Sequence, residues 1–292
     1  MEIDIDQIKR LVIIALASDD ELMERLVLKG GNAIGLLQPG KIGHLIRSSF
    51  DIDFSIEDDF DEELERISAR IKKTVENTFK EHGLTVFDYK FSIRPRKISE
   101  KVRDFWGGYI AEFKLVTTEH FDKVKGDLEV LRREAISVSP GGSPKIEIDI
   151  SKYEYVGKKM ETNVDGYTIF IYTPEMIAFE KLRAICQQLP AYSEIVPAHS
   201  PRPRGRDFYD IPLIMNSHEI DPGTAENKKL LKDIFSAKKV PLEFIQNIPE
   251  DLARHRQDWQ NVLDTLSPQE QKTEFETNAE FIIEKFCSLT FP

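Results

Sequence analysis

The sequence predicts an α+β protein in which a mixed sheet with flanking helices comes first and a helical region follows. Apolar and acidic residues alternate over 51–56 and 145–151, as expected of strands with one buried face. Residues 61–81 instead carry apolar residues at helical spacing, and Gly83 follows where a helix-ending glycine is common. After Tyr172 the apolar spacing is helical.

The remaining segments follow from the same criteria. They predict helices over 8–22, 32–37 and 121–136 and strands over 25–29 and within 84–116. Thr173 followed by Pro174 is a typical helix start, because proline has no N–H group and the first helical turn leaves such groups unpaired. We therefore divide the chain into an α/β domain, residues 1–172, and a helical domain, residues 173–292.

The composition is that of a soluble globular protein, with 292 residues, 40% hydrophobic and 31% charged. No stretch of eighteen apolar residues occurs, and the first six residues are acidic where a secretory signal is basic. We therefore expect a cytoplasmic protein without a membrane partner. Cys186 and Cys287 are too few for a disulfide framework, and the six histidines are too scattered for a zinc motif.

The net charge of −11 argues against a general nucleic-acid-coating protein, whose affinity comes from neutralising phosphates. Two short basic segments stand out against this acidic background, residues 94–97 (RPRK) and 202–206 (RPRGR). Each is either a solvated loop or a local basic patch on an enzyme.

A glycine turn and an acidic strand are the most informative features. Gly30 and Gly31 close an apolar strand and open a helix. A glycine pair at this place often has only a structural role in a tight turn, but its backbone can also approach a phosphate. Asp51 and Asp53 share one face of the next strand, because side chains alternate along a strand. Two carboxylates near such a turn suit a Mg²⁺-dependent phosphoryl or nucleotidyl transferase.

A third carboxylate is available on the segment 145–151. Glu147 and Asp149 lie on one face of this predicted strand, and a mixed sheet can set it beside the strand of Asp51 and Asp53. Either acid would then complete a Mg²⁺ site.

Taken in order, five motifs resemble those of the AbiEii/AbiGii nucleotidyltransferase family, which is itself similar to DNA polymerase β-type nucleotidyltransferases. They are the glycine turn, Arg47-x-Ser49-x-Asp51-x-Asp53, the third acidic strand, Glu180-Lys181-Leu182-Arg183-Ala184 and Arg206-Asp207-x-x-Asp210. The resemblance covers roughly residues 20 to 215 and implies a nucleotidyltransferase-like fold for the first domain. The family includes toxins of type IV toxin–antitoxin systems.

The resemblance implies a phosphate-binding side of the site. By this resemblance, Gly30 and Gly31 form the turn that approaches the nucleotide phosphates, and Arg47 and Ser49 line the phosphate side. Asn32 stands where the family usually has Ser or Thr, and its amide can donate a similar hydrogen bond.

The resemblance also implies catalytic and metal-binding roles. Asp51 and Asp53 would bind the metal with Asp149, which we favour over Glu147 because the family often shows Ile-Asp here. Two further residues follow from it: Lys181 would reach the triphosphate from the second domain, and Asp207 matches the family's last conserved acid. The alternatives are a surface lysine and favourable charges on the first helical turn.

The implied reaction is Mg²⁺-dependent transfer of a nucleoside monophosphate from a nucleoside triphosphate to an RNA, most naturally a tRNA 3′ end. An antitoxin protein is the implied partner. Two alternatives stay open from the residues: nucleotidylation of a protein or small molecule, and a catalytically inactive nucleotide- or partner-binding module.

Overall fold

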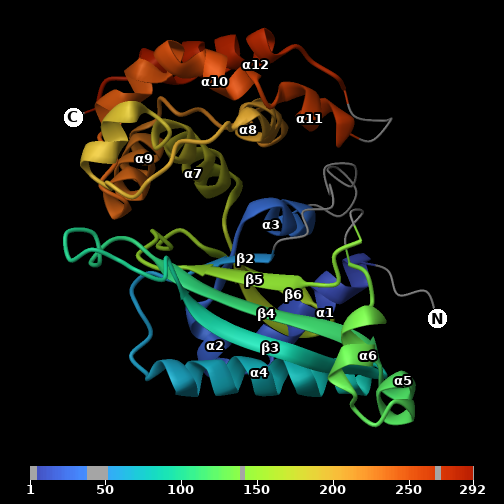
Figure 1. Ribbon diagram of the computed structural model, residues 1–292. Coiled ribbons are helices and arrows are strands. Elements are labelled where there is room, and N and C mark those ends of the chain that lie inside the picture. The colour runs from blue at the N-terminus through green and yellow to red at the C-terminus, as the bar shows by residue number, and fades with distance from the viewer. Residues whose placement is uncertain (1–4, 38–51, 139–141, 267–270, 292) are drawn as a thin grey trace.

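The computed structural model describes residues 5–37, 52–138, 142–266 and 271–291 (Figure 1). Within these ranges the protein has the predicted α+β architecture, built on one seven-stranded sheet. The strands are β1 (Val27–Leu28), β2 (Ile52–Ser55), β3 (Leu84–Arg94), β4 (Gly108–Thr117), β5 (Ile146–Ser151), β6 (Met160–Val164) and β7 (Tyr167–Ile171). The helices are α1 (Ile5–Ala17), α2 (Asp20–Arg25), α3 (Gly30–Leu37), α4 (Leu64–Glu81), α5 (Thr118–Lys123), α6 (Leu128–Arg133), α7 (Pro174–Cys186), α8 (Gly205–Ser217), α9 (Ala225–Ala237), α10 (Leu252–Arg256), α11 (Trp259–Asp264) and α12 (Phe275–Ile282), with short helical segments η1 (Pro190–Glu194), η2 (Leu242–Asp251) and η3 (Ile283–Cys287).

The sheet is mixed, as predicted, in the order β3-β4-β5-β2-β1-β7-β6. Strand β2 runs parallel to β5 and β1 runs parallel to β7, while the other neighbours are antiparallel. Helix α4 packs beneath the sheet beside α1, and α3 lies on the opposite face, toward the helical part of the chain (Figure 1). The predicted face of α4 is buried, including Ile67, Ile71 and Phe79.

Two predicted helices are each divided in two. The segment 8–22 forms α1 and α2, because the Asp19 side chain caps α2 by accepting a hydrogen bond from the Leu22 N–H at 3.1 Å. The segment 121–136 forms α5 and α6, because Lys125 and Gly126 between them both have positive φ.

Strands β6 and β7 were not predicted. They form a hairpin whose turn, Asp165 and Gly166, has φ of 52° and 90°, values that Asp-Gly turns favour.

The predicted start of the helical part is confirmed. Helix α7 begins at Pro174, and the Thr173 hydroxyl accepts a hydrogen bond from the Met176 N–H at 3.3 Å. In the described residues, the regular elements after β7 are all helical. The division of the chain into two domains at residue 172 stays a prediction. None of the described helices is both long and apolar enough to cross a membrane.

Candidate active site

The glycine turn and the acidic strand meet, as the sequence analysis expected. Strand β1 pairs with β2, and Gly30 begins α3 directly beyond β1 with φ of +66°. A Cβ atom at Gly30 would lie 3.2 Å from Oδ2 of Asp53. Both the backbone conformation and this close approach therefore favour glycine at position 30.

We expect Gly30→Ala to lower the free energy of unfolding by about 1–2 kcal/mol, the usual penalty for a Cβ in left-handed backbone. It should also reduce activity by roughly 10²-fold, because the methyl group displaces the Asp53 carboxylate. Gly83→Ala is the matched control, since Gly83 has φ of +73° but no atom of the described residues lies within 4 Å of the added Cβ. Thermal melts and transfer rates of both variants check this, and equal activity loss in the two would contradict it.

Strand pairing sets Asp53 beside one of the two candidate third acids. In the parallel pair of β2 and β5, Asp53 lies opposite Asp149, so both side chains project from one face of neighbouring strands. Arg94 Nη1 donates to Asp149 Oδ2 at 3.0 Å. Glu147 lies two residues before Asp149 on the same face of β5. It lies opposite Glu112 of β4 and forms an ion pair with Lys145.

This pair of carboxylates fits a hard divalent cation such as Mg²⁺ in the chemistry of its donors. In the described ranges no group of three Asp, Glu, His or Cys side chains is arranged to hold a metal ion. Asp51, Arg47 and Ser49 lie outside the described residues. The roles of Asp53, Asp149 and Glu147 therefore stay predictions, with the strand register favouring Asp149 over Glu147.

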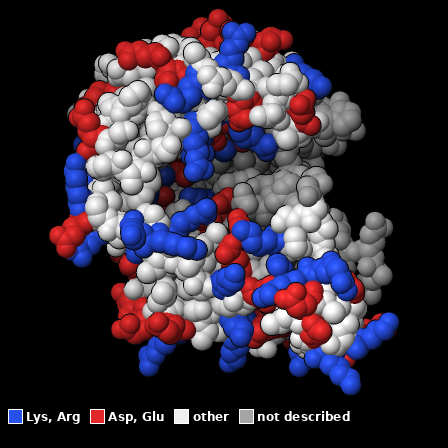
Figure 2. Space-filling model, in the orientation of Figure 1, with Lys and Arg blue, Asp and Glu red and all other residues white. Residues whose placement is uncertain are grey.

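A cleft of about 880 Å³ opens beside these strands, between the sheet and the helical part. Its wall includes residues of β5, α7, the β3–β4 connection and the loop before α8. Among the described residues that line it, seven are basic and three are acidic: Lys29, Arg94, Lys97, Arg183, Arg202, Arg204 and Lys238 against Asp149, Glu154 and Glu180. Figure 2 shows Lys and Arg side chains on both sides of the hollow. An acidic chain thus has a cationic cleft, which suits a phosphate-bearing ligand.

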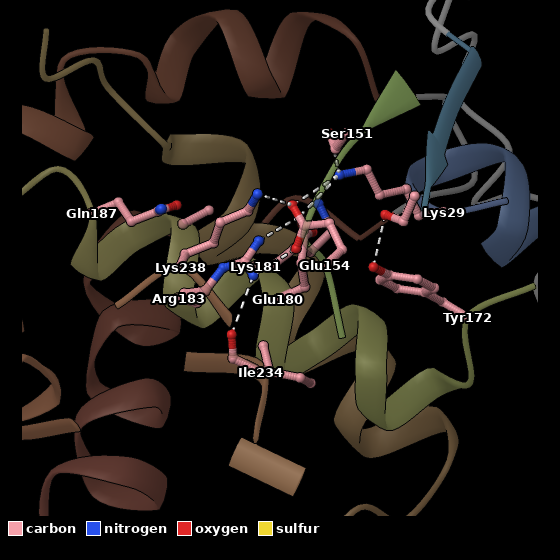
Figure 3. Close-up of polar contacts among 12 residues, drawn as sticks. Lys29, Ser151, Glu154, Tyr172, Glu180, Lys181, Arg183, Gln187, Ile234 and Lys238 are labelled. Carbon is pink, nitrogen blue, oxygen red and sulfur yellow. Dashed lines mark hydrogen bonds and ion pairs between the residues drawn. The ribbon is translucent and has the colours of Figure 1, made fainter. Parts of the chain in front are cut away.

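The inner wall of the cleft holds a buried ionic cluster, which we call the cleft base: Lys29, Glu154, Glu180, Arg183 and Lys238 (Figure 3). Arg183 Nη1 lies 2.7 Å from Glu154 Oε2, and Lys238 Nζ lies 3.4 Å from Glu154 Oε1. Lys29 Nζ lies 3.4 Å from Glu180 Oε1 and donates to Ser151 Oγ at 3.1 Å. The cluster therefore joins β1 and β5 to α7.

The electrostatics of the cleft base follow from its burial and its excess of one cation. Burial alone would raise the pKa of Glu154, but the charges of Arg183, Lys238 and Lys29 outweigh it and hold this pKa well below its usual range. Burial lowers the pKa of Lys238 to about 8, although Glu154 opposes the shift. An anion bound against this wall would offset the excess positive charge.

Lys181 and Asp207, to which the resemblance gave separate roles, form a buried ion pair. Lys181 Nζ lies 2.8 Å from Asp207 Oδ1 and 3.0 Å from Asp210 Oδ2. Burial would lower the pKa of Lys181, yet the two carboxylates raise it. In the part of the chain that the structure describes, neither Lys181 nor Asp207 lines the cleft. Their catalytic roles stay predictions.

No role for the residues of the cleft base was predicted from the sequence. Glu154 and Lys238 were not predicted, Glu180 and Arg183 stood inside a motif without a function of their own, and Lys29 was only the last residue of a predicted strand. One signal was available: Lys29 directly follows the buried strand β1, and a buried charge needs partners.

Comparison with known families gives one match over most of the chain. Residues 13–281 match the family model described as nucleotidyl transferase AbiEii toxin, type IV TA system. No curated protein sequence matches the chain.

Solved structures with a similar chain course include two from Helicobacter pylori. A candidate nucleotidyltransferase is 17% identical, with a TM-score of 0.47 over 97% of this chain and 94% of its own. The protein JHP933 is 18% identical, with a TM-score of 0.47 over 96% and 91%. An antigenic nucleotidyltransferase-like protein from Paracoccidioides brasiliensis is 19% identical, with a TM-score of 0.38 over 80% and 93%. All three scores are below 0.5, so these likenesses assign no function.

Proposed function

The chain belongs to the AbiEii nucleotidyl transferase toxin family of type IV toxin–antitoxin systems, and on that basis we propose which reaction its cleft performs. It transfers a nucleoside monophosphate from a nucleoside triphosphate to an RNA, with a tRNA 3′ end as the preferred acceptor. The observation that carries this proposal is the cationic cleft beside the paired carboxylates Asp53 and Asp149.

In the proposed reaction the acceptor hydroxyl attacks the α-phosphorus of the nucleoside triphosphate, and the bond from that phosphorus to the pyrophosphate oxygen breaks. Asp53 and Asp149 would hold Mg²⁺, with Asp51 as the third predicted ligand. When bound, the metal neutralises charge on the phosphates and favours ionisation of the attacking hydroxyl. The Gly30 turn leaves room for Asp53 to keep its position in this arrangement.

The leaving pyrophosphate needs stabilising cations. Lys29, Arg183 and Lys238 line the cleft and carry more positive charge than Glu154 and Glu180 compensate. They are placed to stabilise negative charge as it develops on the phosphates. Lys181 stays a second candidate for this role, and to fill it the ammonium would have to leave Asp207 and Asp210.

The two basic segments support an RNA acceptor. Arg94 and Lys97 from one segment and Arg202 and Arg204 from the other line the cleft, and all four side chains are exposed. Their modest number predicts an RNA affinity that falls with salt and is not very tight. Both substrates are cytoplasmic molecules, so we expect the reaction in the cytoplasm, where a cognate antitoxin would oppose it.

The test is to incubate the purified protein with Mg²⁺, each α-³²P-labelled nucleoside triphosphate and total cellular RNA, and to separate RNA from protein. We expect label on a tRNA-sized band, and omission of Mg²⁺ should abolish it. Label on protein alone would replace the RNA acceptor with a protein acceptor. Absence of label with every nucleotide and acceptor would contradict the proposed reaction.

A further inference from the structure

Part of the cleft lining differs in chemistry from the cleft base. These lining residues are apolar or aromatic and come from the β3–β4 connection, from α7 and from the loop after η1: Ile98, Val102, Trp106, Ala184, Val196, Pro197 and His199. Trp106 is the largest of these side chains and remains partly exposed. A large aromatic side chain that lines a cleft and stays partly exposed is a typical stacking surface.

Trp106 rests on a firmly held aromatic support. Its ring centroid lies 6.1 Å from that of Tyr192 and 6.2 Å from that of His199, which meets it edge-on. Tyr192 is fully buried, its hydroxyl donates to the Lys238 carbonyl at 2.9 Å, and Gln187 donates to that hydroxyl at 3.1 Å. Because Tyr192 is fixed in this way, the Trp106 ring has a preorganised position.

Trp106 is also continuous with the cationic part of the cleft. Lys238 Nζ, a member of the cleft base, lies 5.7 Å from the Trp106 ring centroid. Gly108, two residues after Trp106, pairs with Ser151 of β5. Asp149 lies two residues before Ser151 on the same strand, which separates the two Cα atoms by about 7 Å. A nucleotide has phosphates at one end and a flat base at the other, which matches a cleft that offers both cations and an aromatic ring.

We propose that the nucleobase of the nucleoside triphosphate stacks on Trp106 while its phosphates bind against the cleft base. This inference rests on the proposed function and specifies where that substrate lies. Trp106 lines the same cleft as the cleft base, and Lys238 of that cluster lies 5.7 Å from the Trp106 ring centroid, so the group stacked there belongs to the molecule whose phosphates the cluster binds. Stacking reads no base edge, so Trp106 should act alike on all four nucleotides.

Tryptophan fluorescence tests this without requiring turnover. The chain has two tryptophans, and Trp259 packs in the helical part against Phe275 and Tyr209, away from the cleft lining. In a Trp259→Phe background the signal comes from Trp106 alone. We expect saturable quenching by each nucleoside triphosphate and none from inorganic tripolyphosphate, which has the phosphates without the base.

The matched variants are Trp106→Ala and Trp106→Phe, with calorimetry as the binding measurement. Trp106→Ala should weaken nucleoside triphosphate binding roughly 5- to 150-fold, the equivalent of one stacked base, while tripolyphosphate binding changes less than about twofold. Trp106→Phe should retain most of the affinity. Equal nucleotide affinity in wild type and Trp106→Ala would overturn the stacking proposal, as would weakening confined to single-stranded RNA. Failure of wild type to bind either phosphate compound would instead overturn the proposed function.

Discussion

Asp53→Asn is expected to reduce nucleotidyl transfer by at least roughly 10³-fold while leaving the fold intact. The metal held by this carboxylate would contribute several kcal/mol to the transition state, and an amide is a much poorer ligand for Mg²⁺. Asp53 is partly exposed on the face of β2 that meets the Gly30 turn, so the isosteric change should not disturb packing. The measurement is a single-turnover transfer rate at saturating nucleotide and Mg²⁺, with a thermal melt as the check on folding.

The strand register supplies a matched pair of controls. Asp149 and Glu147 share one face of β5, but only Asp149 lies opposite Asp53. Asp149→Asn should therefore lose activity about as severely as Asp53→Asn, and Glu147→Gln should stay within about threefold of wild type. The opposite outcome, an inactive Glu147→Gln beside an active Asp149→Asn, would show that the third ligand is Glu147.

Much of the fold near the site was predictable because its signals are local. Strict alternation over 145–151 identified β5. Its placement beside β2 was one arrangement that a mixed sheet allows, and the structure has it. The start of α7 was readable from Thr173 and Pro174 because a cap depends on neighbouring residues only. The sequence also singled out the glycine turn and the acidic strand, and the pairing of β1 with β2 brings Gly30 and Asp53 together.

The hairpin of β6 and β7 was missed for a physical reason. Strand β6 lies at the edge of the sheet and is mostly exposed, so packing imposes no apolar alternation on it. Its turn residues, Asp165 and Gly166, were a usable signal that the sequence analysis did not weigh.

The cleft base could not have been predicted from local patterns. Glu154 follows a strand and Lys238 follows α9, and nothing in either neighbourhood identifies the other as its partner. Their pairing depends on how the helical part packs against the sheet, which is a tertiary property. The same holds for Trp106 and Tyr192, which meet only because the β3–β4 connection reaches the segment η1.

The cleft base leads to the largest stability effect that we expect. Glu154, only 4% exposed, faces Arg183 at 2.7 Å, Lys238 at 3.4 Å and Lys29 at 4.0 Å. Glu154→Gln keeps the size of the side chain but removes the charge that compensates these cations. Breaking a buried ion pair on one side typically lowers the free energy of unfolding by about 3–5 kcal/mol. For a chain of this size the melting temperature should fall by about 10 °C.

The dependence on pH distinguishes lost charge from lost packing. The cations hold the pKa of Glu154 below its unfolded value, so its contribution is present above the ordinary glutamate pKa and is lost as pH falls. The difference in melting temperature between wild type and Glu154→Gln should therefore narrow in acid. Glu161→Gln, at an exposed position of β6, is the control and should change the free energy of unfolding by less than about 0.5 kcal/mol. If Glu154→Gln were no more destabilising than this control, the ion pairs of the cleft base would not stabilise the packing of the helical part on the sheet. The role of its cations would then be limited to binding phosphates.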